Sequence, residues 1–128
     1  MDTPREIRTG EEFALEKLKT YLSENNINTD NLSIKQFPSG YSNLTYFLKS
    51  SSQEFVLRRP PFGAKSLQGG HDMFREYNVL KNLKSQFTKV PDVYLYCDNN
   101  EIIGAPFYLM ERVEGYIIRP NLQQKDSP

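Results

Sequence analysis

The sequence predicts an α+β domain built on an antiparallel sheet, with one helix packed on the sheet and another helix before it. Three short segments with strand character come first, two more follow, and a single amphipathic helical pattern separates the two groups. Strands that occur in runs, rather than alternating with helices, favour this class over a parallel sheet. The length of 128 residues suits one domain.

The composition excludes several classes of function. Sixteen basic and sixteen acidic residues give a net charge of zero, whereas nucleic-acid binders usually carry a basic excess. No apolar run approaches the ~18 residues of a membrane span, and the first residues lack the apolar stretch of a signal peptide. With one cysteine, Cys97, and one histidine, His71, neither an internal disulfide nor a Cys/His metal site is expected. We therefore expect a soluble protein of the cytoplasm.

The first helix is predicted to begin after Thr9 and to end at Asn25. Thr9 and Glu12 match a capping box, a pair of side chains that satisfies free N–H groups at a helix start. The apolar residues that recur at helical spacing are Leu15, Leu18 and Leu22. A helix with this pattern is expected to serve packing only.

Three strands are predicted next, at residues 34–37, 44–48 and 54–59. The second is rich in aromatic residues, and the third ends at Pro60 because proline cannot donate a hydrogen bond to a sheet. The polar residues 50–53 form a short turn. The second and third strands are therefore expected to pair as an antiparallel hairpin.

A loop rich in glycine and proline leads into the second helix, which is predicted from Asp72 to about Phe87. Asp72 suits the N-cap position, where a short polar side chain accepts a backbone N–H. The apolar stripe of this helix is Met73, Tyr77, Leu80, Leu83 and Phe87. Residues 93–97 and 107–110 then have strand composition, with a turn at residues 98–100 between them.

Glu76 is an acid on the apolar stripe of the second helix, four residues before Leu80. A carboxylate in that position is costly unless it is paired. Alternation along the third strand places Arg58 on the same side as Val56, so Arg58 could meet Glu76 where the helix packs on the sheet. From spacing alone, a partly exposed ion pair of small energetic value is the more common outcome.

The loop between the first two strands, Ser39-Gly40-Tyr41-Ser42-Asn43, has the composition of an anion-binding turn. Gly40 lets the backbone approach an anion closely, and the small polar residues offer N–H and hydroxyl donors to a phosphate. A glycine in a hairpin is also simply a turn residue, so both interpretations stay open. Another candidate, Gly63-Ala64-Lys65-Ser66, lacks the spacing of a P-loop.

Four stretches, in this order, resemble the N-terminal lobe of the aminoglycoside phosphotransferase-like kinases, and especially the kinase-like domains fused to acyl-CoA dehydrogenases. They are Gly40-Tyr41-Ser42-Asn43-Leu44-Thr45-Tyr46, Val56-Leu57-Arg58-Arg59-Pro60-Pro61, His71-Asp72-Met73-Phe74-Arg75-Glu76-Tyr77 and Ile103-Gly104-Ala105-Pro106-Phe107-Tyr108-Leu109-Met110-Glu111-Arg112-Val113-Glu114-Gly115. The resemblance implies a kinase-like N-lobe with a five-stranded sheet. It divides the chain into a helical segment at 1–31, the lobe at 32–115 and the start of a crossing to a second lobe at 116–128.

The resemblance also implies how the lobe would bind the phosphates of ATP. The loop at residues 39–43 would cover them, Arg58 would hold them, and Glu76 would orient Arg58. Arginine at this position departs from the lysine of protein kinases. It remains chemically suitable, because a guanidinium can bind phosphate oxygens in bidentate fashion.

At the other end of the nucleotide, the resemblance implies that Val56 roofs the adenine and that Met110 leads into the hinge between the lobes. The backbone C=O of Glu111 and the backbone N–H of Val113 would bond the adenine. The full set of implied nucleotide-binding residues is Ser39, Gly40, Tyr41, Ser42, Asn43, Val56, Arg58, Glu76, Met110, Glu111 and Val113.

The same resemblance places the catalytic machinery elsewhere. In this family, the aspartate that orients the acceptor hydroxyl and the ligands of Mg²⁺ lie in the C-terminal lobe, so no catalytic or metal-binding residue is expected within these 128 residues. The complete enzyme would transfer the γ-phosphate of ATP to a hydroxyl group of a small molecule. This lobe alone would be inactive.

Two alternatives remain open from the sequence. The chain could be a non-catalytic interaction module that keeps the shape of the lobe and binds a partner or a second copy. The surface expected to do so contains Leu109, Met110, Tyr116, Ile117 and Ile118. Alternatively, the motif matches are coincidental and the chain is an unrelated α+β domain.

Overall fold

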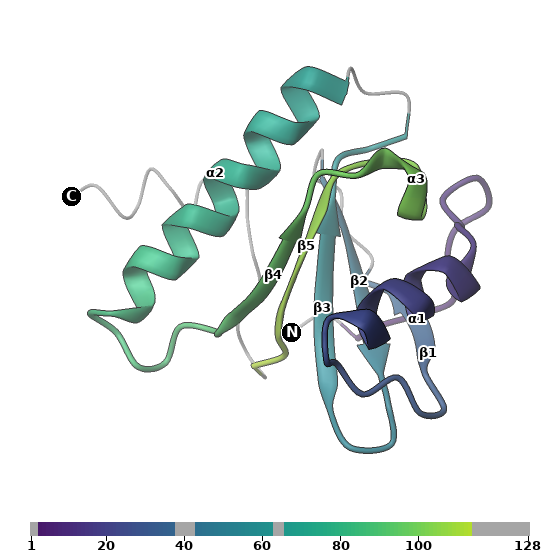
Figure 1. Ribbon diagram of the computed structural model, residues 1–128, viewed down its shortest axis with the longest axis horizontal. Helices are drawn as coiled ribbons and strands as arrows, with labels where there is room; N and C mark the ends of the chain where they lie inside the picture. Colours follow the sequence, from purple (N-terminus) through teal and green to yellow (C-terminus); the bar gives the residue numbers. More distant parts are fainter. Residues whose placement is uncertain (1–2, 38–42, 63–65, 114–128) are drawn as a thin grey trace.

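The computed structural model describes residues 3–37, 43–62 and 66–113. It confirms the α+β class and the five-stranded antiparallel sheet (Figure 1). The elements in chain order are α1 (Leu15–Glu24), β1 (Ser33–Gln36), β2 (Leu44–Lys49), β3 (Glu54–Arg59), α2 (Ser66–Lys84), β4 (Val93–Cys97), α3 (Asn100–Ile103) and β5 (Phe107–Glu111). All five predicted strands are observed, and their ends agree to within one residue.

The strands lie in the order β1-β2-β3-β5-β4, and every neighbouring pair is antiparallel. β3 lies in the middle of the sheet, and five of its six residues are buried. Figure 1 shows α2 on one face of the sheet and α1 with α3 on the other. The prediction of a helix on one face is therefore confirmed, but the second face is covered as well.

Alternation along β3 divides the buried apolar residues into two clusters, one on each face of the sheet. The α1-side core contains Leu57 of β3 and Leu22 of α1. The α2-side core consists of Phe37, Val56, Met73, Leu80, Val90, Tyr108 and Met110. The predicted separation of Val56 from Leu57 onto opposite faces is thus confirmed.

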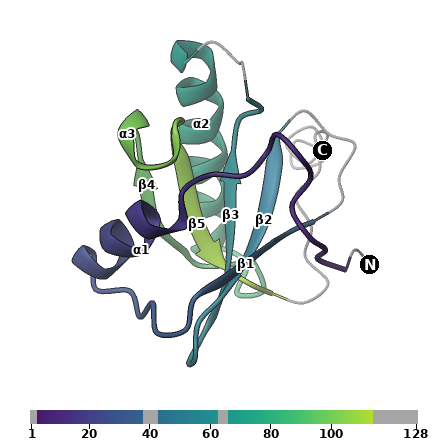
Figure 2. The same cartoon turned by 90° about the vertical axis from the view of Figure 1, so that its right-hand side faces the viewer.

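The segment before α1 pairs with the edge of the sheet. Gln36, buried at the end of β1, exchanges two backbone hydrogen bonds of 2.7 Å with Arg5, and its side-chain amide donates to Glu11 Oε1 at 2.6 Å. Figure 2 shows this segment crossing the sheet on its way to α1. The predicted capping box is wrong, because α1 begins at Leu15 and Gly10, with a φ of +89°, turns the chain before it. The segment stays extended because its polar groups find partners on β1 rather than within a helix.

The second helix begins earlier than predicted, at Ser66, and ends at Lys84. Asp72 is therefore not its N-cap. Asp72 instead forms an exposed ion pair with Arg75 one turn later, with 2.9 Å between Oδ1 and Nη2. Phe87 lies beyond the helix and is 55% exposed, so its predicted place on the apolar stripe is wrong.

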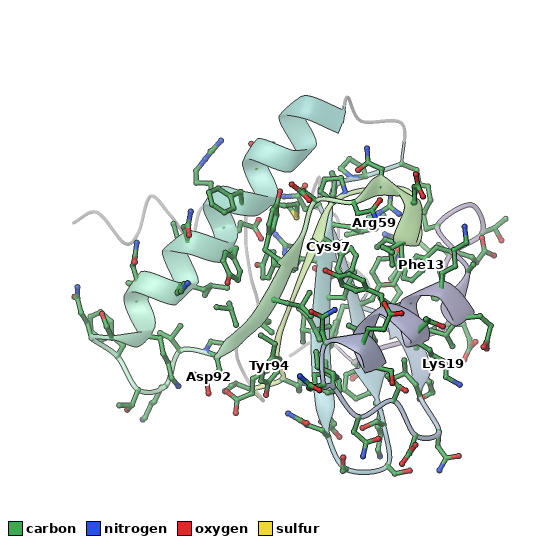
Figure 3. All side chains as sticks on the ribbon, in the orientation of Figure 1. Phe13, Lys19, Arg59, Asp92, Tyr94 and Cys97 are labelled. Carbon is green, nitrogen blue, oxygen red and sulfur yellow. The ribbon has the colours of Figure 1, made fainter. Side chains whose placement is uncertain are left out.

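The predicted turn at residues 98–100 leads into the short helix α3. The Asn99 side chain caps this helix by accepting the N–H of Glu101 at 2.9 Å, and Gly104 ends it with a φ of +87°. The buried Arg59 donates to the backbone C=O of Ile103, the last residue of α3, at 3.0 Å. Figure 3 shows Arg59 on the α1 and α3 side of the sheet, away from α2.

The alkaline stability of the chain should depend on Tyr46, whose buried hydroxyl donates to the backbone C=O of Glu11 at 2.7 Å. Burial raises the pKa of Tyr46 from 10.0 to about 12, although the charge of Arg59 opposes the shift. The contribution of Tyr46 to stability is therefore complete below the pKa of the unfolded chain and is lost as the pH rises from about 10 toward 12. We expect the free energy of unfolding, measured by urea titration, to fall over this range, and to fall less steeply in Tyr46→Phe. Equal slopes would contradict this assignment.

Candidate functional site

The Arg58–Glu76 pair joins β3 to α2. Arg58 lies on the α2 side of the sheet, and its Nη2 and Nε atoms donate to Glu76 Oε2 and Oε1 at 2.6 and 3.0 Å. This is a side-on, bidentate contact. The two side chains are only 4% and 14% exposed. The predicted meeting of Arg58 and Glu76 is therefore confirmed. Arg58 is buried and Glu76 is partly buried, so the pair is less exposed than spacing alone favoured, because the helix packs over it.

Three neighbouring side chains complete the site. Thr45 lies opposite Arg58 on β2, and its Oγ1 accepts a hydrogen bond from Arg58 Nη1 at 2.7 Å. Tyr108 lies opposite Arg58 on β5, and its hydroxyl donates to Glu76 Oε1 at 2.7 Å. Asn43, just before β2, donates from Nδ2 to Glu76 Oε2 at 3.2 Å. Thr45 and Tyr108 were not predicted, since only the strand register places them beside Arg58.

Charge compensation keeps the guanidinium of Arg58 protonated. Burial acts to lower the pKa of Arg58, but the Glu76 carboxylate outweighs it and the pKa is raised above its ordinary value. Burial, and then the charge of Glu76, raise the pKa of the Tyr108 hydroxyl well above its ordinary range. Arg58 therefore remains a cation and Tyr108 remains a protonated donor.

Arg58 keeps donors for a further ligand. A guanidinium has five N–H groups, with one bidentate edge at Nε and Nη2 and a second edge at Nη1 and Nη2. The hydrogen bonds to Glu76 use the first edge, and Thr45 takes one N–H of Nη1. Counting these hydrogen bonds among the described residues, one N–H remains on each Nη atom. Two such donors can bind oxygens of a phosphate.

An apolar wall lies beside the ion pair on the same face of the sheet. Val56 and Met110 are opposite each other in register, and both are buried in the α2-side core. Phe37 and Phe47 extend this wall toward β1, and the guanidinium of Arg112 lies 5.1 Å from the centroid of each ring. The structure thus brings the two predicted adenine-contacting side chains together, next to rings and a cation that were not predicted.

The structure describes some, but not all, of the residues predicted for the hinge and for the phosphate loop. Glu111 ends β5, where its backbone N–H donates to the C=O of Asp92 at 2.8 Å, and Val113 lies two residues further along. Asn43 directs its side chain to Glu76, so the structure shows it orienting the carboxylate. The other members of the predicted phosphate loop lie outside the described residues: Ser39, Gly40, Tyr41 and Ser42.

The predicted partner surface is partly wrong. Leu109 and Met110 are 0% and 2% exposed, because the former packs in the α1-side core and the latter in the α2-side core. The remaining predicted members, Tyr116, Ile117 and Ile118, lie outside the described residues.

Among residues 3–37, 43–62 and 66–113, no group of three or more His, Cys, Asp or Glu side chains is placed to hold a metal ion. No helix in the same residues is long and apolar enough to cross a bilayer.

Comparisons with known proteins bear on the family and the fold of this chain. A family model described as "Phosphotransferase enzyme family" matches residues 33–128. A crystal structure of a candidate aminoglycoside phosphotransferase from Ralstonia eutropha superimposes with a TM-score of 0.68 at 30% sequence identity, covering 84% of this chain and 30% of that chain.

Curated relatives extend the comparison. The chain is 39% identical over 127 residues to acyl-CoA dehydrogenase family member 11 of Rattus norvegicus, covering 93% of this chain and 16% of the relative. It is 38% identical over 107 residues to acyl-CoA dehydrogenase family member 10 of Mus musculus, covering 83% of this chain and 10% of the relative. The chain therefore spans between 10% and 16% of the length of these two relatives.

Proposed function

The chain belongs to the phosphotransferase enzyme family, and from this premise we propose that it is the ATP-binding N-terminal lobe of an enzyme that phosphorylates a hydroxyl group of a small molecule. One observation carries the proposal. Arg58 is a buried cation whose charge is compensated by Glu76, and one N–H on each Nη atom is left by its hydrogen bonds to the described residues. These two N–H groups could bind oxygens of a phosphate.

On this proposal the nucleotide would lie on the α2-side face, as the family resemblance implies. The phosphates would lie against Arg58, and the family resemblance implies that residues 39–43 bind them as well. The adenine would lie along the wall that contains Val56 and Met110, and Val56 is two residues before Arg58 on the same face of β3. The hinge backbone at residues 111–113 would then bond the edge of the base, as the family resemblance implies.

Phosphoryl transfer itself would need a second lobe. The reaction requires an aspartate that orients the acceptor hydroxyl, and Mg²⁺, which would neutralise the charge of the phosphates when bound. The described residues do not fit a magnesium site, because no group of three or more His, Cys, Asp or Glu side chains among them is placed to hold a metal ion. What this lobe supplies is the orientation of ATP: Arg58 holds phosphate oxygens, and Glu76 holds Arg58. We expect no phosphoryl transfer by the 128-residue chain alone.

Calorimetric titration of the chain with ATP and with adenosine tests the proposal. We expect ATP to bind weakly, with a dissociation constant on the order of 1 mM, because a single lobe leaves the nucleotide open to water. Adenosine should bind roughly tenfold more weakly, because it lacks the phosphates that Arg58 contacts. Equal affinities for the two ligands, or no heat from either at about ten times that concentration, would contradict it.

A further inference from the structure

Tyr108 lies at the centre of the site but has no part in the roles that the family resemblance implies. It is fully buried, and it stands opposite Arg58 on β5, as Thr45 does on β2. The three side chains form one row across three strands on the α2-side face. Glu76 reaches into this row from the helix above it, where Arg58 and Tyr108 both donate to Oε1.

The hydrogen bonds of Glu76 are divided evenly between its two oxygens. Oε1 accepts from Arg58 Nε and from Tyr108, whereas Oε2 accepts from Arg58 Nη2 and from Asn43. A side-on bidentate contact needs both carboxylate oxygens near the plane of the guanidinium. Tyr108 and Asn43 each hold one oxygen, so together they prevent the carboxylate from rotating about its last bond.

The two holding contacts differ in strength. The Tyr108 bond is 2.7 Å long and comes from a strand in the middle of the fold, whereas the Asn43 bond is 3.2 Å long and comes from the end of a loop. A hydroxyl donor to a charged acceptor at the shorter distance is the stronger of the two. Tyr108 is therefore the principal contact that fixes the plane of the Glu76 carboxylate.

We propose that Tyr108 is a positioning residue for phosphate binding: by fixing the Glu76 carboxylate, it aims the second edge of Arg58 at the phosphates of the nucleotide. This inference rests on the proposed function. It goes further in assigning a role to a β5 side chain that would not touch the nucleotide. Its effect on binding would pass through Glu76 and through Arg58, with which Tyr108 also interacts across the sheet.

The substitution Tyr108→Phe tests the inference, because it removes the hydroxyl and keeps the ring. Tyr46→Phe is a matched control: Tyr46 is equally buried and also donates one 2.7 Å hydrogen bond, but on the opposite face of the sheet. We expect Tyr108→Phe to weaken ATP binding about three- to tenfold and to leave adenosine binding unchanged. Tyr46→Phe should change the ratio of the two affinities by less than about twofold. A Tyr108→Phe protein with the wild-type ratio would overturn the inference.

A second readout does not depend on nucleotide. Hydrogen exchange of the Arg58 Nε–H group, followed by NMR in the free chain, should be about three- to tenfold faster in Tyr108→Phe and unchanged in Tyr46→Phe. Exchange that stays as slow as in the wild type would overturn the positioning role whatever the affinities are. Faster exchange, in a chain whose wild type binds ATP and adenosine equally, would support the positioning of Arg58 and refute the proposed function alone.

Discussion

Replacement of Glu76 by alanine should lower the free energy of unfolding by about 3–5 kcal/mol, the cost of leaving one charge of a buried pair without its partner. The Arg58 side chain is 4% exposed, so water cannot replace the lost carboxylate. The hydroxyl of Tyr108, which is fully buried, would lose its acceptor as well. Urea unfolding of the two proteins at neutral pH measures the difference.

The same helix offers a control for this substitution. Asp72 also pairs with an arginine, Arg75, but these side chains are 39% and 59% exposed. Asp72→Ala should therefore change the free energy of unfolding by less than about 0.5 kcal/mol. The loss in free energy of unfolding for Glu76→Gln should lie between the losses for the two alanine variants, because the amide keeps one acceptor oxygen for Arg58 and Tyr108. Similar small losses in Glu76→Ala and Asp72→Ala would show that the Arg58–Glu76 pair is not buried in solution.

Replacement of Arg58 by lysine should weaken ATP binding roughly tenfold, because an ammonium group keeps the charge but cannot form two bidentate contacts at once. A lysine at this position could satisfy Glu76 or the phosphates, but not both with paired donors. Adenosine binding should be unchanged, since the base would lie against Val56 and Met110. Calorimetric titration of both ligands separates these two effects.

The neighbouring arginine provides the matched control. Arg59 follows Arg58 on β3 and is equally buried, but its guanidinium lies on the opposite face and donates to Pro60 and Ile103. Arg59→Lys should therefore leave the ratio of ATP to adenosine affinity unchanged, even if it lowers stability. If both lysine variants weakened ATP binding equally, Arg58 would have no special part in holding the phosphates.

Much of the fold could be predicted from sequence because the signals were local. Alternation and turn residues located all five strands, and the separation of Val56 from Leu57 followed from the two-residue period of a strand. The secondary-structure predictions were wrong where hydrogen bonds to residues far along the chain determine the local structure. The segment before α1 looked like a helix start, but its polar groups bond to Gln36 on β1.

Residue spacing shows which side chains share one face of a helix or one face of a strand, and this much of the candidate site could be predicted. The spacing paired Glu76 with Arg58 correctly but underestimated the burial of the pair. Thr45 and Tyr108 could not be found in this way, because their place beside Arg58 depends on the register of three strands separated along the chain. Asn43 was assigned to the phosphates, and only the structure shows its bond to Glu76.

The most direct test of phosphate binding at Arg58 is an NMR titration of the isotope-labelled chain that follows the guanidinium N–H signals of its arginines. We expect ATP to shift the Arg58 signals progressively to saturation, while adenosine leaves them in place and neither ligand moves those of Arg59. ATP that binds, as judged by shifts elsewhere in the chain, while the Arg58 signals stay unmoved would contradict the assignment.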